Sequence, residues 1–237
     1  MFKAFSAFAL GALALLAAGC NGNNKFIYAA DSGSFVSFPD DKPTATVVVP
    51  PFLVERGEDS RMGSSMLGMI PLVPFGYAEM NQPENNESFY SITYYDFSPA
   101  NDLAQAAAVS LRASKLFARV DQCRAAKSDA KYEFRGTVLA TDYKARWFTY
   151  GVTYLLASPL WIVGCPTGSS SCHLAVRFDL IDRATGANVW EYTFDESDYI
   201  NHWLYCRYGD DTNLFPVLMK RAMNKALAGL ASSGVLQ

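Results

Sequence analysis

Residues 172–195 read CHLAVRFDLIDRATGANVWEYTFD and contain two alternating apolar patterns on either side of a turn. The first pattern has an apolar residue at every second position, at Leu174, Val176, Phe178 and Leu180. The second repeats this spacing at Trp190, Tyr192 and Phe194. A period of two is typical of strands with one buried face, and Gly186 in the turn can adopt a positive φ. The segment therefore predicts two antiparallel strands joined by a hairpin.

The residues before the hairpin predict two more strands. Residues 131–143 are expected to form a strand, in which Gly136 is bracketed by Tyr132, Phe134, Thr137, Leu139 and Thr141. The β-branched run TVVV at 46–49 is typical of a buried strand and is expected to open the fold. The Pro50-Pro51 pair ends regular pairing there, because proline lacks a backbone N–H.

Two helices are also predicted. Ser98 and Pro99 supply a capping hydroxyl followed by proline at the first helical position, which is typical of a helix start. Residues 214–230 place apolar side chains at helical spacing, with Lys220 and Arg221 on the other face.

The order of these elements predicts the fold class. Strand, helix, antiparallel meander and helix follow one another in a single α+β domain over residues 43–237. Two apolar loop insertions interrupt this domain, at about residues 62–78 and 147–165.

Composition restricts the possible functions. The chain has 237 residues, with 20 Lys+Arg against 23 Asp+Glu, a formal charge of −3 and two histidines. No excess of basic residues is present to bind a nucleic acid, so no nucleic-acid partner is expected. Half of the residues are hydrophobic, which argues against a disordered chain.

The first twenty residues predict export. Residues 1–19 have a positive start and a short apolar run, which is typical of a signal peptide. The run ends LLAAGC at Cys20 and resembles the lipobox of bacterial lipoproteins, although Ala17 stands where leucine is preferred. This resemblance implies an acylated Cys20, and Asn21 in place of aspartate implies the outer membrane, facing the periplasm. Residues 20–42 would be a lipidated tether. An ordinary Ala-x-Ala cleavage site is the alternative.

The remaining four cysteines predict disulfides. They are Cys123, Cys165, Cys172 and Cys206, an even number in an exported chain. Of the three possible connectivities, we predict Cys165–Cys172 across a turn-rich stretch, and Cys123–Cys206. Neither His173 nor His202 completes a zinc spacing, so no metal or other cofactor is expected.

Three segments carry a family resemblance. They are KLFARV at 115–120, AKYEFRGTV at 130–138 and LIDRATG at 180–186. In this order the chain resembles, over about residues 44–233, the α/β domain shared by the curli-secretion channel lipoprotein and the amino-terminal domain of the Tol translocation β-propeller protein. The resemblance implies a non-enzymatic periplasmic scaffold, which is sometimes oligomeric and in one branch a pore.

Residues 147–164, WFTYGVTYLLASPLWIVG, carry no charge. Three interpretations are open: buried core, a segment that dips into a membrane, and a protein-docking patch. The apolar run at 66–75 is the expected covering partner. The predicted contact residues are Tyr150, Tyr154, Leu155, Leu160, Trp161 and Ile162, with Ile70, Leu72 and Phe75 opposite.

No catalytic residue is predicted. The chain lacks a Gly-x-Ser-x-Gly elbow, and its carboxylate clusters at 195–198 and 210–211 are typical of solvated turns. We therefore predict a non-catalytic envelope lipoprotein, an accessory or scaffold in outer-membrane assembly or transport that acts through apolar loop contacts. It would bind an envelope protein or itself. The alternatives are an oligomeric secretion channel that inserts the apolar segments in the outer membrane, and a hydrolase built on His202.

Overall fold

The computed structural model describes residues 25–30, 44–57, 59–62, 77–81, 95–124, 127–207 and 209–236. The predicted signal peptide and Cys20 lie outside these residues, as do three predicted contact residues, Ile70, Leu72 and Phe75.

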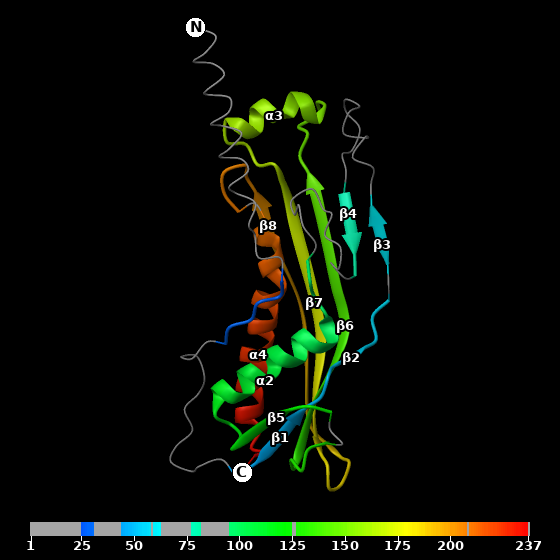
Figure 1. The fold of residues 1–237 in the computed structure, drawn as a ribbon, viewed down its shortest axis with the longest axis vertical. Coiled ribbons are helices and arrows are strands. Elements are labelled where there is room, and N and C mark those ends of the chain that lie inside the picture. The colour runs from blue at the N-terminus through cyan, green and yellow to red at the C-terminus, as the bar shows by residue number, and fades with distance from the viewer. Residues whose placement is uncertain are drawn as a thin grey trace.

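Within the described residues, eight strands form one sheet (Figure 1). They are β1 (Thr46–Val49), β2 (Leu53–Val54), β3 (Ser60–Met62), β4 (Tyr77–Met80), β5 (Arg119–Gln122), β6 (Tyr132–Trp147), β7 (Gly168–Asp182) and β8 (Asn188–His202). β6, β7 and β8 pair antiparallel in sequence order, with Phe134 opposite Leu180 and Phe178 opposite Tyr192. These three strands are the longest, and they give the molecule its elongated shape.

The sheet is mixed, which corrects the predicted antiparallel meander. β1 pairs in parallel with both β5 and β6, and β2 pairs in parallel with β6. The chain between β1 and β5 contains helix α2 (Pro99–Ser114), and a helical crossover of this kind brings two strands side by side in the same direction. The described domain is therefore a mixed α/β arrangement.

Two long helices cover one face of the sheet. Helix α2 begins with Pro99 at its first turn, as predicted, and the backbone N–H of Ser98 donates to Asp102 Oδ2 at 2.6 Å. Helix α2 ends at Lys115, whose φ of 56° is left-handed. Helix α4 (Leu214–Ser232) packs on β7, β8 and α2, and the short helix η3 (Asp210–Asn213) leads into it. The buried side chains between these helices and the sheet form the core, and they include Leu103, Leu111, Phe134, Leu174, Phe178, Phe215 and Leu218.

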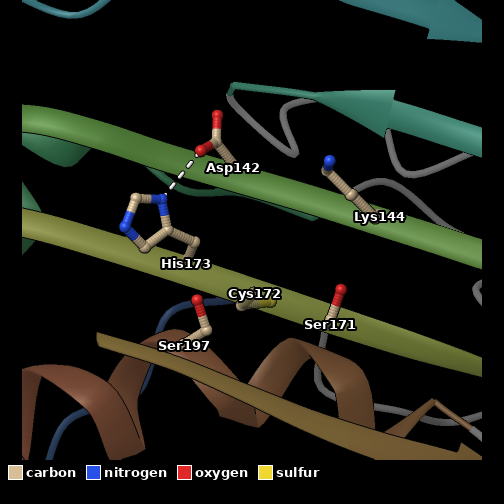
Figure 2. A pocket seen from close by; sticks show the side chains of 6 residues that line it. All are labelled: Asp142, Lys144, Ser171, Cys172, His173 and Ser197. Carbon is tan, nitrogen blue, oxygen red and sulfur yellow. Dashed lines mark hydrogen bonds and ion pairs between the residues drawn. The ribbon is translucent and has the colours of Figure 1, made fainter. Parts of the chain in front are cut away.

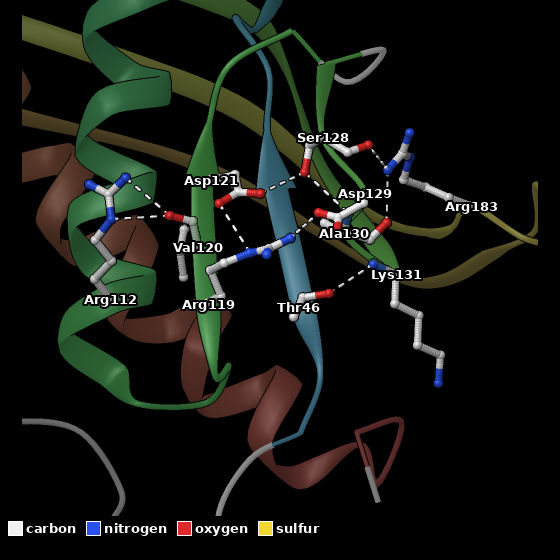
Figure 3. A network of polar contacts seen from close by, with 10 residues as sticks. All are labelled: Thr46, Arg112, Arg119, Val120, Asp121, Ser128, Asp129, Ala130, Lys131 and Arg183. Carbon is white, nitrogen blue, oxygen red and sulfur yellow. Dashed lines mark hydrogen bonds and ion pairs between the residues drawn. The ribbon is translucent and has the colours of Figure 1, made fainter.

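Polar contacts fix the short strands at the β1–β5 end of the sheet (Figure 3). Arg119 pairs with Asp121 and Asp129, and Arg183 Nη1 donates to the carbonyl oxygens of Ser128 and Ala130 at 2.7 and 2.8 Å. Side-chain contacts of this kind support strands of only four residues, which have few ladder hydrogen bonds of their own.

Phe52 packs directly over Gly136 in β6. A Cβ atom added at Gly136 would lie 2.5 Å from three atoms of the Phe52 ring. The ring itself is buried and makes an edge contact with Phe178, with 6.1 Å between the centroids. Glycine within a strand is therefore explained here by the close approach of an aromatic ring.

Residues 25–30, part of the predicted tether, lie against the domain. The backbone N–H of Phe26 donates to the Asp96 carbonyl at 3.2 Å, and the Phe26 ring stacks on Phe97 at 5.2 Å. Tyr28 Oη lies 2.5 Å from Ser110 Oγ of α2. Residues 25–30 are thus held to the domain.

Candidate functional site

A short helix stands at one end of the sheet, between β6 and β7. Helix α3 (Tyr154–Ile162) has nine residues and contains Pro159. Its start is capped by Thr153, whose side chain accepts from the Leu156 N–H. The turn before it uses left-handed backbone at Tyr150 and Gly151, with φ of 56° and 78°. The predicted insertion at 147–165 is therefore a turn followed by a helix, at the end of the molecule opposite β1 and β5 (Figure 1).

One side of α3 holds it to the sheet. Ala157 is fully buried, and the indole N–H of Trp161 donates to the Phe148 carbonyl at 3.0 Å. The rings of Trp161 and Trp147 make an edge contact at 6.4 Å. The Phe148 N–H also donates to the Thr167 carbonyl at 2.9 Å, which closes the base of the insertion. These contacts fix α3 in place without the help of α2 or α4.

The other side of α3 is apolar and exposed. Val163 is 77% exposed, Leu156 65% and Ile162 58%, and Leu160 and Tyr150 are exposed as well. Tyr205, from the turn after β8, is also exposed and donates its hydroxyl to the Ile162 carbonyl at 3.0 Å. We call this surface the apolar tip and define it as Tyr150, Leu156, Leu160, Ile162, Val163 and Tyr205.

The apolar tip contains three of the predicted contact residues: Tyr150, Leu160 and Ile162. Trp161 is half-buried, and Tyr154 and Leu155 belong to α3 by their backbone. The sequence interpretation did not name Leu156, Val163 or Tyr205. Leu156 and Val163 lie within the uncharged segment, but only the helical geometry shows which side of it faces solvent. Tyr205 comes from a distant part of the chain, so no local pattern links it to α3.

None of the helices in the described residues has both the length and the apolar character needed to cross a membrane.

A polar hollow lies on the sheet face opposite the helices (Figure 2). It has a volume of about 330 Å³, and its lining includes Asp142, Lys144, Ser171, His173 and Ser197. His173 Nδ1 lies 2.8 Å from Asp142 Oδ2, and its Nε2 lies 2.7 Å from Asp195 Oδ1. Partial burial lowers the pKa of His173, but the hydrogen bonds and charges of Asp142 and Asp195 outweigh this effect and raise it overall.

The geometry of His173 leaves neither ring nitrogen available as a general base or as a metal ligand. Both nitrogens face a carboxylate, so the charged imidazolium can donate two hydrogen bonds across three strands. A general base or a metal ligand needs one nitrogen with a free lone pair. No group of His, Cys, Asp and Glu in the described part of the chain is arranged to hold a metal ion.

His202 belongs to a buried polar network. Its Nε2 lies 2.8 Å from Ser170 Oγ, and its Nδ1 lies 2.9 Å from the Arg207 carbonyl. The nearby carboxylate, Asp211, contacts Ser170 and the hydroxyl of Tyr143. In a catalytic triad the acid would orient the histidine through Nδ1, but a backbone carbonyl occupies that position here. His202, Ser170 and Asp211 are all almost fully buried, so the network lies in the interior next to η3 and offers no open site to a substrate.

The structure corrects the predicted disulfides, because Cys123, Cys165, Cys172 and Cys206 are free thiols. Cys172 points into the core from the fifth position of β7, whereas Cys165 precedes that strand. Four strand residues span about 13 Å, and a disulfide needs Cα atoms within about 7 Å. Cys123 follows β5 at one end of the sheet, and Cys206 lies in the turn that contacts α3 at the other (Figure 1).

The apolar tip is thus the surface of the described chain with the clearest binding chemistry.

Comparisons with known proteins add little to this result. No family model and no curated protein matches the chain. Three solved structures resemble it in part. A Xanthomonas campestris protein of the DUF330 family is 8% identical, with a TM-score of 0.46, and the match covers 89% of this chain and 94% of that one.

The other two likenesses are weaker. A PelC dodecamer from Paraburkholderia phytofirmans is 16% identical with a TM-score of 0.33, over 78% of this chain and 93% of that one. A proposed lipoprotein of Caulobacter crescentus is 17% identical with a TM-score of 0.28, over 45% of this chain and 68% of that one. All three TM-scores lie below 0.5, so these likenesses carry no argument about function. The resemblance to the curli and Tol domains stays a prediction.

Proposed function

We propose that this chain is a non-catalytic lipoprotein of the bacterial outer membrane, anchored through Cys20 and facing the periplasm. It acts as an accessory or scaffold in envelope assembly or transport, and its working surface is the apolar tip.

The observation that carries the proposal is an apolar helix outside the core, with exposed Leu156, Ile162 and Val163. A helix of this composition is normally buried, and exposing it to water is unfavourable. Fully burying a valine, leucine or isoleucine side chain stabilises by about 1.5–3 kcal/mol. At their observed exposures, Leu156, Ile162 and Val163 together would gain roughly 3–6 kcal/mol from a contact that covers them. A gain of this size favours a contact that covers these side chains, and it would add to the attachment through Cys20.

The fixed position of α3 supports a contact role over a packing role. Trp161 already attaches the helix to the end of β6, through the Phe148 carbonyl and the Trp147 ring, so its exposed side is not needed for that attachment. The contact surface is therefore preorganised, which reduces the entropy lost on binding.

The use of the two histidines supports the non-catalytic part of the proposal. His173 directs both nitrogens at carboxylates, and His202 is fully buried against Ser170 and a carbonyl. The ring nitrogens of both histidines are already bonded within the protein, which supports a non-catalytic role.

The test has two parts. Mass spectrometry of the mature amino terminus should show acyl chains on Cys20, and a Cys20→Ser chain should be released from the envelope. Benzoylphenylalanine at position 162 should then give light-dependent adducts in the envelope, with protein or with lipid. The same residue at position 53 is the matched control, because Leu53 is 53% exposed but lies on β2. Equal adduct yields at both positions would contradict the proposal.

The alternative of an oligomeric secretion channel has less support. It requires the insertion at 147–165 to form extended hairpins that enter the outer membrane. Residues 154–162 instead form helix α3.

A further inference from the structure

The attachment of residues 25–30 to the domain limits how far the domain can stand from its anchor. Lys25 is fixed by a backbone bridge to Asp96 and by an ion pair with its carboxylate at 3.8 Å. Phe26 and Tyr28 then pack against the core. Only residues 21–24 separate Lys25 from Cys20. Five fully extended steps span at most about 18 Å, so an acylated Cys20 lies within that distance of Lys25.

The fixed end of this tether lies nearer the α3 end of the sheet than the β1–β5 end. The Phe26 ring stacks on Phe97, and the Phe97 ring stacks on Phe215 in the first turn of α4, each with 5.2 Å between the ring centroids. Just before α4, Asp211 of η3 contacts Ser170 of β7. Ser170 is two residues from the start of β7, which is about 7 Å, and twelve residues from its end, which is about 40 Å. In Figure 1 residues 25–30, in blue, lie beside α4 between the two ends of the molecule.

These lengths decide which end can face the bilayer. A tether of about 18 Å is less than half of the distance from this position to the opposite end of the sheet, so the α3 end is the end nearer the anchor. An acylated Cys20 would therefore place the apolar tip closer to the lipid surface than the β1–β5 end.

The apolar tip has the chemistry of a membrane-interface contact. The segment from Trp147 to Gly164 carries no charge that would have to be desolvated. The backbone of α3 is hydrogen-bonded internally, as a segment at the edge of hydrocarbon requires. Tyr150, Trp161 and Tyr205 have their polar atoms bonded to carbonyl oxygens, and tyrosine and tryptophan are enriched where lipid meets water.

From these lengths and this chemistry we infer that the apolar tip is a lipid-surface contact, which lies in the headgroup region of the membrane that holds Cys20. Helix α3 would lie in the interface without spanning the membrane, because its nine residues make only about 14 Å of helix. The inference rests on the proposed function, because it needs the acylated anchor to set the orientation.

The first experiment removes the anchor. Residues 20–237 carrying Cys20→Ser are mixed with phosphatidylcholine vesicles and floated on a density gradient. We expect a fraction to float, and Leu156→Gln/Ile162→Gln/Val163→Gln to lower the partition coefficient at least about tenfold. Leu53→Gln/Val54→Gln, which removes exposed apolar side chains from β2, should leave it unchanged. A folded parent chain that does not float would overturn the inference, and so would an equal loss in both variants.

The second experiment uses the anchored protein and its own thiols. Cys206 is exposed on the turn that contacts α3, whereas Cys123 lies at the β1–β5 end. Attachment of the acylated chain to vesicles should slow maleimide labelling of Cys206 at least about fivefold, relative to the soluble Cys20→Ser chain, and leave Cys123 unaffected. Equal rates at Cys206 with confirmed acylation would overturn the inference and leave the anchor intact. Absence of acyl chains would instead contradict the proposed function.

Discussion

Replacing Gly136 by alanine tests whether the Phe52 ring determines the residue at this position of β6. The added methyl group would lie 2.5 Å from three ring atoms, whereas ordinary contacts are no shorter than about 3.4 Å. The ring cannot easily retreat, because it is only 4% exposed and is packed against Phe178. Either β6 or Phe52 must therefore shift by several tenths of an ångström.

The expected loss of stability follows from this overlap. Overpacking a filled core costs about 1–3 kcal/mol, and the lower entropy of unfolded alanine returns about 0.4–1 kcal/mol. Because the overlap is severe, we expect Gly136→Ala to lower the free energy of unfolding by about 1–2 kcal/mol, which is about 2–8 °C in Tm for a domain of this size. Urea unfolding followed by circular dichroism measures the first quantity, and calorimetry measures the second.

A second glycine provides the control, because the same change there should have the opposite sign. Gly229 lies in α4, and an added Cβ would meet only Trp190 at 3.9 Å. Gly229→Ala should therefore stabilise by about 0.5–1 kcal/mol through helix propensity. In a Phe52→Leu background, the cost of Gly136→Ala should fall by at least about 1 kcal/mol, because the two sites are in contact. A Gly136→Ala chain within about 0.5 kcal/mol of the parent, or no coupling to position 52, would refute the argument.

Three further predictions concern groups outside this contact. The raised pKa of His173 means that its ion pairs stabilise the fold fully below about pH 6.5, and that this contribution is lost as the pH rises through the folded-state pKa. His173→Gln should therefore be less stable than the parent by up to about 1 kcal/mol at pH 5.5 and by less at pH 9. Urea titrations that give the same difference in free energy of unfolding at both pH values would contradict this. Alkylation of the unfolded, unreduced Cys20→Ser chain should add four adducts by mass, and two adducts or none would restore the disulfide prediction. In the folded chain Cys206 should react and Cys172 should not, because burial raises the pKa of the Cys172 thiol and blocks access to it. Ala157→Asp should detach α3 and speed proteolysis between residues 148 and 167 by about tenfold or more. Ile162→Asn should leave α3 resistant, because Ala157 is fully buried whereas Ile162 is 58% exposed.

The sequence predicts those parts of the fold in which side chains repeat with a clear period. Alternation over residues 172–195 indicates β7 and β8, and Ser98-Pro99 indicates the start of α2. The parallel pairing of β1 with β5 was not predicted, because Arg119–Gln122 is a short, partly exposed strand without alternation. A pairing of this kind depends on contacts between distant residues, which a local pattern does not contain.

The candidate site was predicted in its location but not in its shape. Absence of charge marks residues 147–164, yet composition alone does not separate the buried side of α3 from the exposed one. The disulfide prediction failed for a related reason. An even number of cysteines says nothing about where each one lies, and Cys172 follows the apolar face of β7 into the core.

The long antiparallel strands set the length of the domain. β6 has sixteen residues, which at about 3.3 Å per residue make a ribbon roughly 50 Å long. If α3 lies on the lipid, the exposed turn at residues 184–188 is at the opposite end of these strands, far from the headgroups. The length of the strands would then set the distance between the membrane surface and anything that binds at this turn. Lengthening β6, β7 and β8 by two residues each would raise that partner by about 7 Å without turning any side chain to the other face.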